Sequence, residues 1–249
     1  MEKTQETSQL SKMRKAVEKQ LGSSTENYGD IMLMRFLIAR SMDPVKATKM
    51  FIDWKKWREE FVPLGYIPDS QVPDQLESKK IFLQSFSTNG HPVVIIKTNR
   101  HFTPKDQLQF KKFVVHVLDK TIASAFKEGR EIENEKLVVV LDLGNIGYKN
   151  IDARALITGF QFLQSYYPER LAKLFILSMP WFFVSVWKMV SHFLEQATLD
   201  KIVIVSNEDE HESFIKEVGK DALPEEYGGR AKVVAIQDVK LVQSPTVVD

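Results

Sequence analysis

The run from Leu137 to Leu141 constrains the fold of this chain more than any other stretch. It contains five consecutive apolar residues, Leu-Val-Val-Val-Leu. Such a run is too short for a helix and too apolar for a strand that keeps one face in water. It therefore predicts a strand in a parallel sheet that is covered on both faces.

Helices and strands alternate on both sides of this run, which predicts an α/β fold. Residues 81–86 and 93–96 flank the turn residues Thr88-Asn89-Gly90 and predict an antiparallel hairpin, so the sheet should be mixed. The other elements predicted here are helices at residues 104–126, 152–167, 181–194 and 208–218, and strands at residues 173–178, 201–205 and 233–236.

The first quarter of the chain predicts helices only. Apolar residues recur at helical spacing from Leu10 to Leu21, and further helices are expected at residues 31–40 and 44–61. The last of these has Asp43 as its expected cap. Its two tryptophans, Trp54 and Trp57, are interpreted as packing residues.

Three prolines and a glycine interrupt the helical pattern between residues 62 and 73. We therefore expect a small helical N-terminal lobe at residues 1–72 and an α/β lobe at residues 73–249. The tail after residue 236 is expected to be loose.

Composition limits the partners and the compartment. The chain has 34 Lys and Arg against 33 Asp and Glu, so its formal charge of +1 gives no field that would gather nucleic acid. It has no cysteine, which excludes disulfides and thiolate sites and fits a reducing compartment. The polar start lacks a signal peptide, and the longest uncharged stretch is shorter than the roughly 20 residues that span a bilayer. A cytoplasmic protein that is transiently peripheral to membranes is expected.

The predicted helix at residues 181–194 is apolar around most of its circumference. Two interpretations stay open at this point. The helix is either fully buried, or it covers a lipid cavity with one side and touches a bilayer or a protein with the other. His192 on this helix is interpreted as structural.

The sequence offers no catalytic constellation. It contains no Gly-x-Ser-x-Gly elbow, no phosphate-binding glycine loop and no dinucleotide-binding glycine pattern, and its five histidines are scattered. We therefore expect no enzyme, no catalytic residues, no metal site and no cofactor other than a bound lipid.

Three stretches carry a family resemblance: LMRFLIARSMDPVKA from Leu33, YYPERLAKLFILSMPWFF from Tyr166, and LDKIVIV from Leu199. With them the chain resembles the CRAL-TRIO lipid-binding family. It is most similar to the branch of the yeast phosphatidylinositol/phosphatidylcholine transfer protein. The resemblance runs from about residue 10 to residue 236.

The resemblance implies a CRAL-TRIO fold, in which the mixed sheet floors a hydrophobic lipid cavity and a mobile gate helix closes it. The residues assigned to the gate are Trp181, Phe182, Val186, Trp187, Val190 and Phe193. It also implies a phosphatidylinositol headgroup site at Arg40, Glu169, Thr198 and Lys201. The two cations would neutralise the phosphodiester, and the carboxylate would accept inositol hydroxyls.

The residues taken alone leave ordinary roles open for these positions. Arg40 could oppose a helix dipole, Glu169 and Arg170 could be solvated charges, and Thr198 could cap a turn.

The sequence departs from the two-ligand members of the family at the positions that hold phosphatidylcholine. By the same alignment these are Leu83, Val94, Leu137, Val139 and Leu141, and all of them are apolar. An unmet choline phosphate there would cost several kcal/mol, so phosphatidylcholine in its usual pose is disfavoured. The last three alternate along one strand and should share one face, which we predict to be the cavity floor.

The expected function is therefore that of a monomeric lipid carrier. It would bind phosphatidylinositol in a gated cavity and exchange it at membrane surfaces, with a second, less polar ligand or none. Two alternatives remain within lipid binding: a carrier of a single apolar lipid such as a sterol, isoprenoid or tocopherol, and a module that presents phosphatidylinositol to a lipid kinase or regulates a signalling partner. An enzyme is the third alternative.

Overall fold

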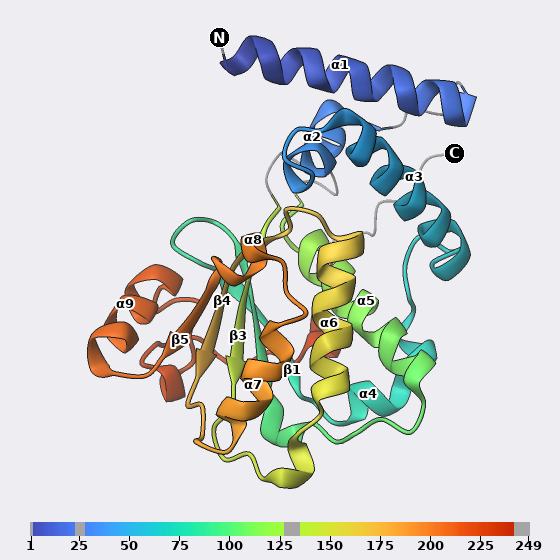
Figure 1. Ribbon diagram of the computed structural model, residues 1–249. Coiled ribbons are helices and arrows are strands. Elements are labelled where there is room, and N and C mark those ends of the chain that lie inside the picture. The colour runs from blue at the N-terminus through green and yellow to red at the C-terminus, as the bar shows by residue number, and fades with distance from the viewer. Residues whose placement is uncertain (1, 23–27, 127–134, 242–249) are drawn as a thin grey trace. The chain divides into compact units, whose positions relative to one another are not determined.

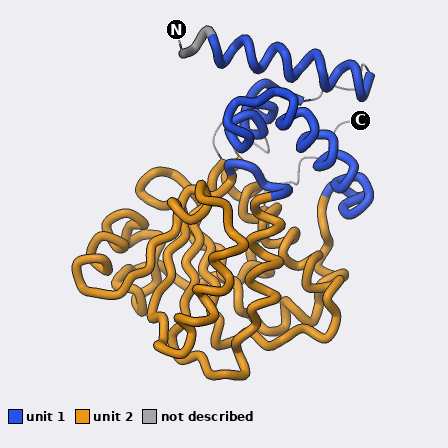
Figure 2. The backbone as a smooth tube through the Cα atoms, viewed as in Figure 1, with its two compact units in different colours: residues 1–65, 165–169 blue, residues 66–164, 170–249 orange. Residues whose placement is uncertain are grey.

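The computed structural model describes residues 2–22, 28–126 and 135–241, and the chain divides into two compact units. Unit 1 contains the described residues up to Gly65 together with Ser165–Glu169, and unit 2 contains the rest (Figure 2). The division follows Gly65, compared with the boundary after residue 72 expected from the sequence. The sequence analysis did not predict that Ser165–Glu169 belongs to unit 1.

Unit 1 is built from three long helices, as the sequence predicted. They are α1 (Glu2–Leu21), α2 (Asp30–Ala39) and α3 (Pro44–Phe61). Asp43 caps α3, because its side chain accepts hydrogen bonds from the backbone N–H groups of Val45 and Lys46. The core of this unit is formed by Met13, Val17, Leu33, Phe36, Leu37, Ala47, Met50 and Phe51.

Both tryptophans of α3 pack within unit 1. Trp54 lies in edge contact with Phe36, with ring centroids 5.7 Å apart. Trp57 stacks on Tyr166, with centroids 3.7 Å apart and the planes 7° from parallel. Trp57 thus anchors the short segment Ser165–Glu169 to the helices of unit 1.

Unit 2 contains one five-stranded sheet in the order β1-β2-β3-β4-β5 (Figure 1). β1 pairs antiparallel with β2, and the other neighbours are parallel, so the predicted mixed sheet is confirmed. The strands are β1 (Ile81–Phe86), β2 (Pro92–Lys97), β3 (Leu137–Asp142), β4 (Leu171–Leu177) and β5 (Ile202–Val205). The helices are α4 (Pro73–Glu77), α5 (Gln107–Ala123), α6 (Ala153–Tyr166), α7 (Phe183–Ser191), α8 (Gln196–Leu199) and α9 (Glu208–Val218).

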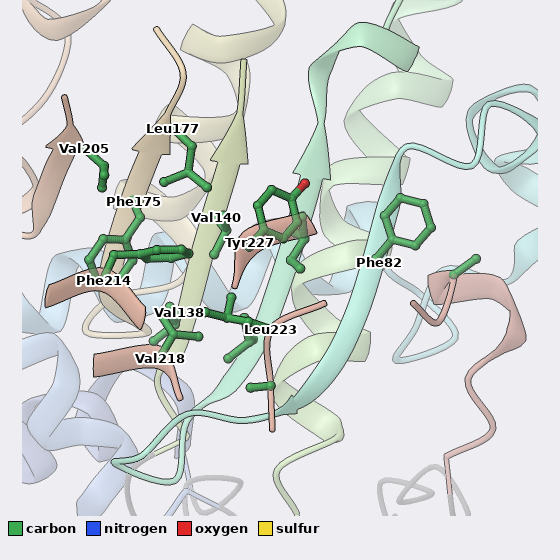
Figure 3. Close-up of a cluster of buried hydrophobic side chains, with 14 residues drawn as sticks. Phe82, Val138, Val140, Phe175, Leu177, Val205, Phe214, Val218, Leu223 and Tyr227 are labelled. Atoms are coloured by element: carbon green, nitrogen blue, oxygen red, sulfur yellow. The ribbon is translucent and has the colours of Figure 1, made fainter. Parts of the chain in front are cut away.

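Both faces of the sheet are covered. Figure 1 shows α5, α6 and α7 on one side of the sheet and α9 on the other. On the α9 side, Phe214 and Val218 of α9 and Tyr227 lie against Val138 and Phe175 (Figure 3). The five apolar residues from Leu137 to Leu141 are consequently between 0 and 8% exposed, which confirms that this strand is covered on both faces.

Two predicted helices are shorter than their sequence pattern. The helix expected from residue 104 begins at Gln107, because the Asp106 side chain accepts a hydrogen bond from the Gln109 N–H and caps it there. The apolar helix expected at residues 181–194 is helical only from Phe183 to Ser191. Within the described ranges, no helix combines the length and apolarity needed to cross a membrane.

The strand predicted at residues 233–236 is wrong. Ala235 makes one isolated bridge to Phe82, and the carbonyl of Val234 accepts a hydrogen bond from the Leu83 N–H at 3.0 Å. The next residues form a 3₁₀ turn, Ile236–Asp238, so the extended backbone needed for a ladder ends there. Of the tail predicted to be loose, residues up to Leu241 are described, and residues 242–249 lie outside the described part.

Candidate functional site

The residues predicted to floor a lipid cavity share one face of the sheet. Leu83, Val94 and Val139 stand opposite one another across three neighbouring strands. Leu137 and Leu141 lie two positions on either side of Val139, and alternation along the strand puts all three on that face. Val138 and Val140, which lie between these residues, belong to the core on the α9 side. The five residues therefore share the other face, and their role in lining a lipid cavity stays a prediction.

This face is apolar and packed. All five side chains are at most 8% exposed, and helices α5, α6 and α7 cover the same side of the sheet (Figure 1). None of these five side chains has an atom that can form a hydrogen bond with a polar group of a ligand. Contact with a lipid stays a prediction for them, since it requires the covering helices to make room.

Helix α7 carries apolar residues on both of its sides, but only one side is buried. Phe183, Trp187 and Val190 follow one another at helical spacing and are less than 10% exposed. On the outer side, Met189 is 47% exposed and Phe193, just beyond the helix, is 52% exposed. The interpretation of a fully buried helix is therefore wrong, and the surviving one is a helix that covers the sheet with one side and presents apolar groups with the other.

The predicted gate residues divide in the same way. Trp187 and Val190 are on the buried side, Phe182 and Val186 are half-buried, and Trp181 and Phe193 are exposed. Gln164 of α6 ties down the C-terminal end of this segment: its amide nitrogen donates to the Phe193 carbonyl, and its amide oxygen accepts from the Glu195 N–H at 2.7 Å. Movement of α7 as a gate stays a prediction.

Two of the four predicted headgroup residues lie together in unit 2. Thr198 is in the short helix α8, and its carbonyl accepts a hydrogen bond from the Lys201 N–H at 3.1 Å. The Lys201 carbonyl in turn accepts from Leu174 N–H of β4 at 2.9 Å. One tight turn thus places two half-buried residues, Thr198 and Lys201, just before β5 and beside β4.

The other two predicted headgroup residues belong to unit 1. Arg40 ends α2 and is half-buried, and one of its guanidinium nitrogens donates to the Ala39 carbonyl at 2.8 Å. Glu169 closes the segment that Trp57 anchors, and its φ of +56° is in the left-handed region. A non-glycine residue in this region is under backbone strain, which is found more often at functional positions than elsewhere.

Sequence reasoning missed the partner of Arg170. Its guanidinium donates to the Glu135 carboxylate at 3.1 Å and to the Glu135 carbonyl at 3.0 Å. Glu135 is only 2% exposed, so Arg170 is not a solvated loop charge. No local signal marks Glu135, because the two residues meet only when β3 and β4 pair.

A second missed group is a buried polar chain beneath α5. Lys80 donates to the Gln75 side-chain oxygen at 2.7 Å and lies 3.2 Å from His101 Nδ1. His101 Nε2 lies 3.3 Å from the Asp152 carboxylate. Burial lowers the pKa of Lys80 to about 8, against a smaller opposing effect from Asp152. Burial, with the Lys80 charge beside it, also lowers the pKa of His101.

The described residues contain no cluster of three or more His, Cys, Asp or Glu side chains that could hold a metal ion.

Comparison with known proteins identifies the family. Residues 76–229 match the model of the CRAL/TRIO domain, which spans more than half of the chain. The chain therefore belongs to the CRAL-TRIO domain family.

Individual relatives agree with this assignment. The chain is 28% identical to the Sec14 cytosolic factor of Schizosaccharomyces pombe over 84% of its own length and 77% of that protein. It is 29% identical to the phosphatidylinositol transfer protein CSR1 of Eremothecium gossypii, covering 86% of this chain and half of that one. The crystal structure of Sfh5 has the same fold, with a TM-score of 0.70 and 18% identity over 97% of this chain and 93% of that one.

Proposed function

We propose that this protein binds phosphatidylinositol and exchanges it between membranes. The observation that supports the proposal is the turn that places Thr198 and Lys201 close together in the chain beside β4. The family resemblance implies that these two residues bind the headgroup. A hydroxyl and an ammonium group on one turn suit a phosphodiester, since hydrogen bonds to charged groups contribute about 1.5 to 3 kcal/mol each.

Arg40 and Glu169 complete the proposed set of headgroup residues. They belong to unit 1, and the matched residue types support their inclusion. The guanidinium would neutralise phosphate, and the carboxylate would accept hydrogen bonds from inositol hydroxyls. The left-handed backbone of Glu169 supports a functional role for this residue, because backbone strain of this kind is found more often at functional sites than elsewhere.

The apolar face of the sheet would take the acyl chains. Extracting two chains of about 32 methylenes into water costs on the order of 25 kcal/mol, so an apolar container is what a carrier must supply. The lack of polar groups at Leu83, Val94 and Val139 disfavours phosphatidylcholine in the family's usual pose. A second ligand, if one is carried, would be a sterol or an isoprenoid.

The proposal includes a cytoplasmic monomer that meets membranes transiently. A balanced charge of +1 supports release after each encounter, because long-range attraction to anionic lipid would be weak. Presentation of the bound phosphatidylinositol to a lipid kinase would use the same complex.

The direct test is the identity of the bound lipid. Protein equilibrated with vesicles that contain phosphatidylinositol, phosphatidylcholine and a sterol would be examined by native mass spectrometry. We expect phosphatidylinositol to exceed phosphatidylcholine. The reverse ratio would contradict the proposal.

Variants test the headgroup residues. Lys201→Ala should lower phosphatidylinositol transfer about tenfold or more, because one charged hydrogen-bond partner is lost. Glu169→Gly should have a similar effect and is preferred to alanine, since glycine tolerates the left-handed backbone. Lys216→Ala, on the exposed side of α9, is the matched control and should transfer normally. Normal transfer by Lys201→Ala at an unchanged melting temperature would remove that residue from the site.

A carrier of one purely apolar lipid is the second candidate. The apolar character of Leu83, Val94 and Val139 favours it. In that case the copurified lipid would be a sterol or isoprenoid, and Lys201→Ala would leave its transfer unchanged.

A further inference from the structure

Exposed aromatic residues gather at one edge of the sheet in unit 2. Tyr148 lies 4.9 Å from Phe182 between ring centroids, and Phe182 lies 5.8 Å from Trp181. The Lys149 ammonium lies 5.6 Å from the centre of the Phe102 ring. We call these five residues the aromatic edge. Trp181 is 80% exposed, Tyr148 72% and Phe102 54%, which is unusual for side chains of this size.

The topology explains why these residues meet. They lie on the loops that follow β2, β3 and β4, which are parallel. The last residues of these strands, Lys97, Asp142 and Leu177, stand opposite one another in register. The three loops therefore leave the sheet at the same edge, the lower one in Figure 1.

Buried hydrogen bonds hold two of these loops together. The Asn150 side chain donates to the carbonyls of Asn99 and His101, at 3.1 and 2.9 Å. His101 contacts the Asp152 carboxylate, which also accepts from the Ala155 N–H and so begins α6. These hydrogen bonds hold the loops that carry Phe102 and Tyr148 in place. The two rings are therefore exposed because of the loop conformation.

The charges near the edge favour an anionic surface. The carboxylate of Asp142 is engaged internally, because it accepts from Tyr227 Oη at 2.7 Å and from the Gly144 N–H. The carboxylate of Asp152 is engaged by His101 in the same way. Lys149, in contrast, is exposed beside the rings. A positive charge therefore accompanies the aromatic groups, while the carboxylates of Asp142 and Asp152 are engaged in hydrogen bonds within unit 2.

We infer that the aromatic edge is the surface by which this protein sits in the interfacial layer of an anionic lipid bilayer. Indole and phenol rings combine an apolar body with a polar tip and concentrate at this depth of a membrane. A neighbouring lysine extends its charge to the lipid phosphates. The exposed apolar groups Met189 and Phe193 continue the same character from Trp181 along α7.

This inference rests on the proposed function, since a lipid carrier must contact a bilayer. It adds the loops after β2 and β3 to the first two gate residues, Trp181 and Phe182, as the point of contact. The test is sedimentation with vesicles made of equal parts of phosphatidylcholine and phosphatidylserine. The double variant Tyr148→Ser/Trp181→Ser should bind these vesicles about tenfold more weakly or worse, because two large rings no longer enter the interface.

Phe86→Ser is the matched control. Phe86 is an exposed phenylalanine, 48% accessible, next to the hairpin turn at the opposite edge of the sheet. Its variant should bind vesicles as the wild type does. Lys149→Glu should weaken binding to the phosphatidylserine vesicles and leave binding to pure phosphatidylcholine vesicles unchanged.

Tryptophan fluorescence gives a readout that does not depend on affinity. Brominated lipid should quench the vesicle-bound wild type, and Trp181→Phe, which keeps an aromatic ring, should remove most of that quenching. Undiminished quenching in Trp181→Phe would overturn the inference, as would equal vesicle binding by the double variant and Phe86→Ser. If the double variant binds vesicles normally but no longer binds a protein that the wild type binds, the inference is overturned and the aromatic edge is a protein-binding surface.

The outcomes separate this inference from the proposed function. If wild-type protein carries phosphatidylinositol while the double variant still binds vesicles normally, the edge is wrong and the carrier stands. If the edge governs vesicle binding but no lipid copurifies, the carrier is wrong and the edge stands.

Discussion

The two faces of the sheet in unit 2 are both apolar, yet they are closed differently. On the α9 side, polar bonds fasten the cover at its rim: Tyr227 donates to Asp142 at 2.7 Å, and Lys173 pairs with Glu217 of α9 at 2.9 Å. On the side of α5, α6 and α7, the cover includes α7, which exposes the apolar side chains of Val184 and Met189 beside Ser185 and Lys188. We therefore expect the α9 side of the sheet to be closed more firmly than the side that α7 covers.

The two sides of the sheet also differ in how their buried polar groups titrate. Burial, followed by the neighbouring Asp142 carboxylate, raises the pKa of Tyr227, so its hydroxyl remains a donor well above neutral pH. On the other side, burial lowers the pKa of Lys80 to about 8. Tyr227 on the α9 side thus keeps its proton through the pH range in which Lys80, in the polar chain beneath α5, loses its own.

The largest expected effect tests the more firmly closed face. Phe214 is fully buried in α9, with its ring centroid 5.0 Å from that of Phe175. Phe214→Ala should lower the free energy of unfolding by about 3 to 5 kcal/mol, because it leaves a ring-sized cavity in a core that cannot collapse around it. Urea denaturation followed by circular dichroism measures this. A loss below about 1 kcal/mol would mean that the α9 side is as loosely closed as the other.

The next effect concerns Lys80 and follows from the sign of its pKa shift. Its pKa falls from 10.5 in the unfolded chain to about 8 in the folded one, so the unfolded state binds more protons between these values. Stability should therefore rise with pH across this window, by about 3 kcal/mol at most, and the full penalty should apply below about pH 8. Lys80→Met should flatten this part of the stability curve, measured by urea denaturation across the window. An unchanged slope would show that other groups produce it.

Sequence patterns predicted much of this fold because burial and helix capping depend on residues that are close together in the chain. The run Leu137–Leu141 required two covered faces, and Asp43 followed by Pro44 marked the start of α3 to the residue. The strand expected at residues 233–236 failed because an apolar run cannot show that its pairing with β1 is limited to an isolated bridge at Phe82 and the hydrogen bond from the Leu83 N–H.

The candidate sites divide along the same line. Alternation alone placed Leu137, Val139 and Leu141 on one face, whereas the four headgroup positions came from family resemblance. The aromatic edge could not be predicted, because Phe102, Tyr148 and Trp181 are far apart in the sequence and meet only through the register of β2, β3 and β4.

The smallest expected effect tests the cover of the less firmly closed face. Thr121 of α5 is fully buried, and its hydroxyl has no hydrogen-bond partner within the described part of the chain. A buried hydroxyl left in this state is destabilising, so the isosteric change Thr121→Val should raise the free energy of unfolding by about 1 kcal/mol. Thr48→Val is the matched control, because the buried Thr48 hydroxyl does donate, to the Pro44 carbonyl at 2.6 Å, and its removal should be destabilising. Urea denaturation of both variants without added lipid compares them directly. If Thr121→Val is destabilising as well, the Thr121 hydroxyl has a hydrogen-bond partner. The buried polar groups in this part of α5 would then be hydrogen-bonded as completely as those on the α9 side.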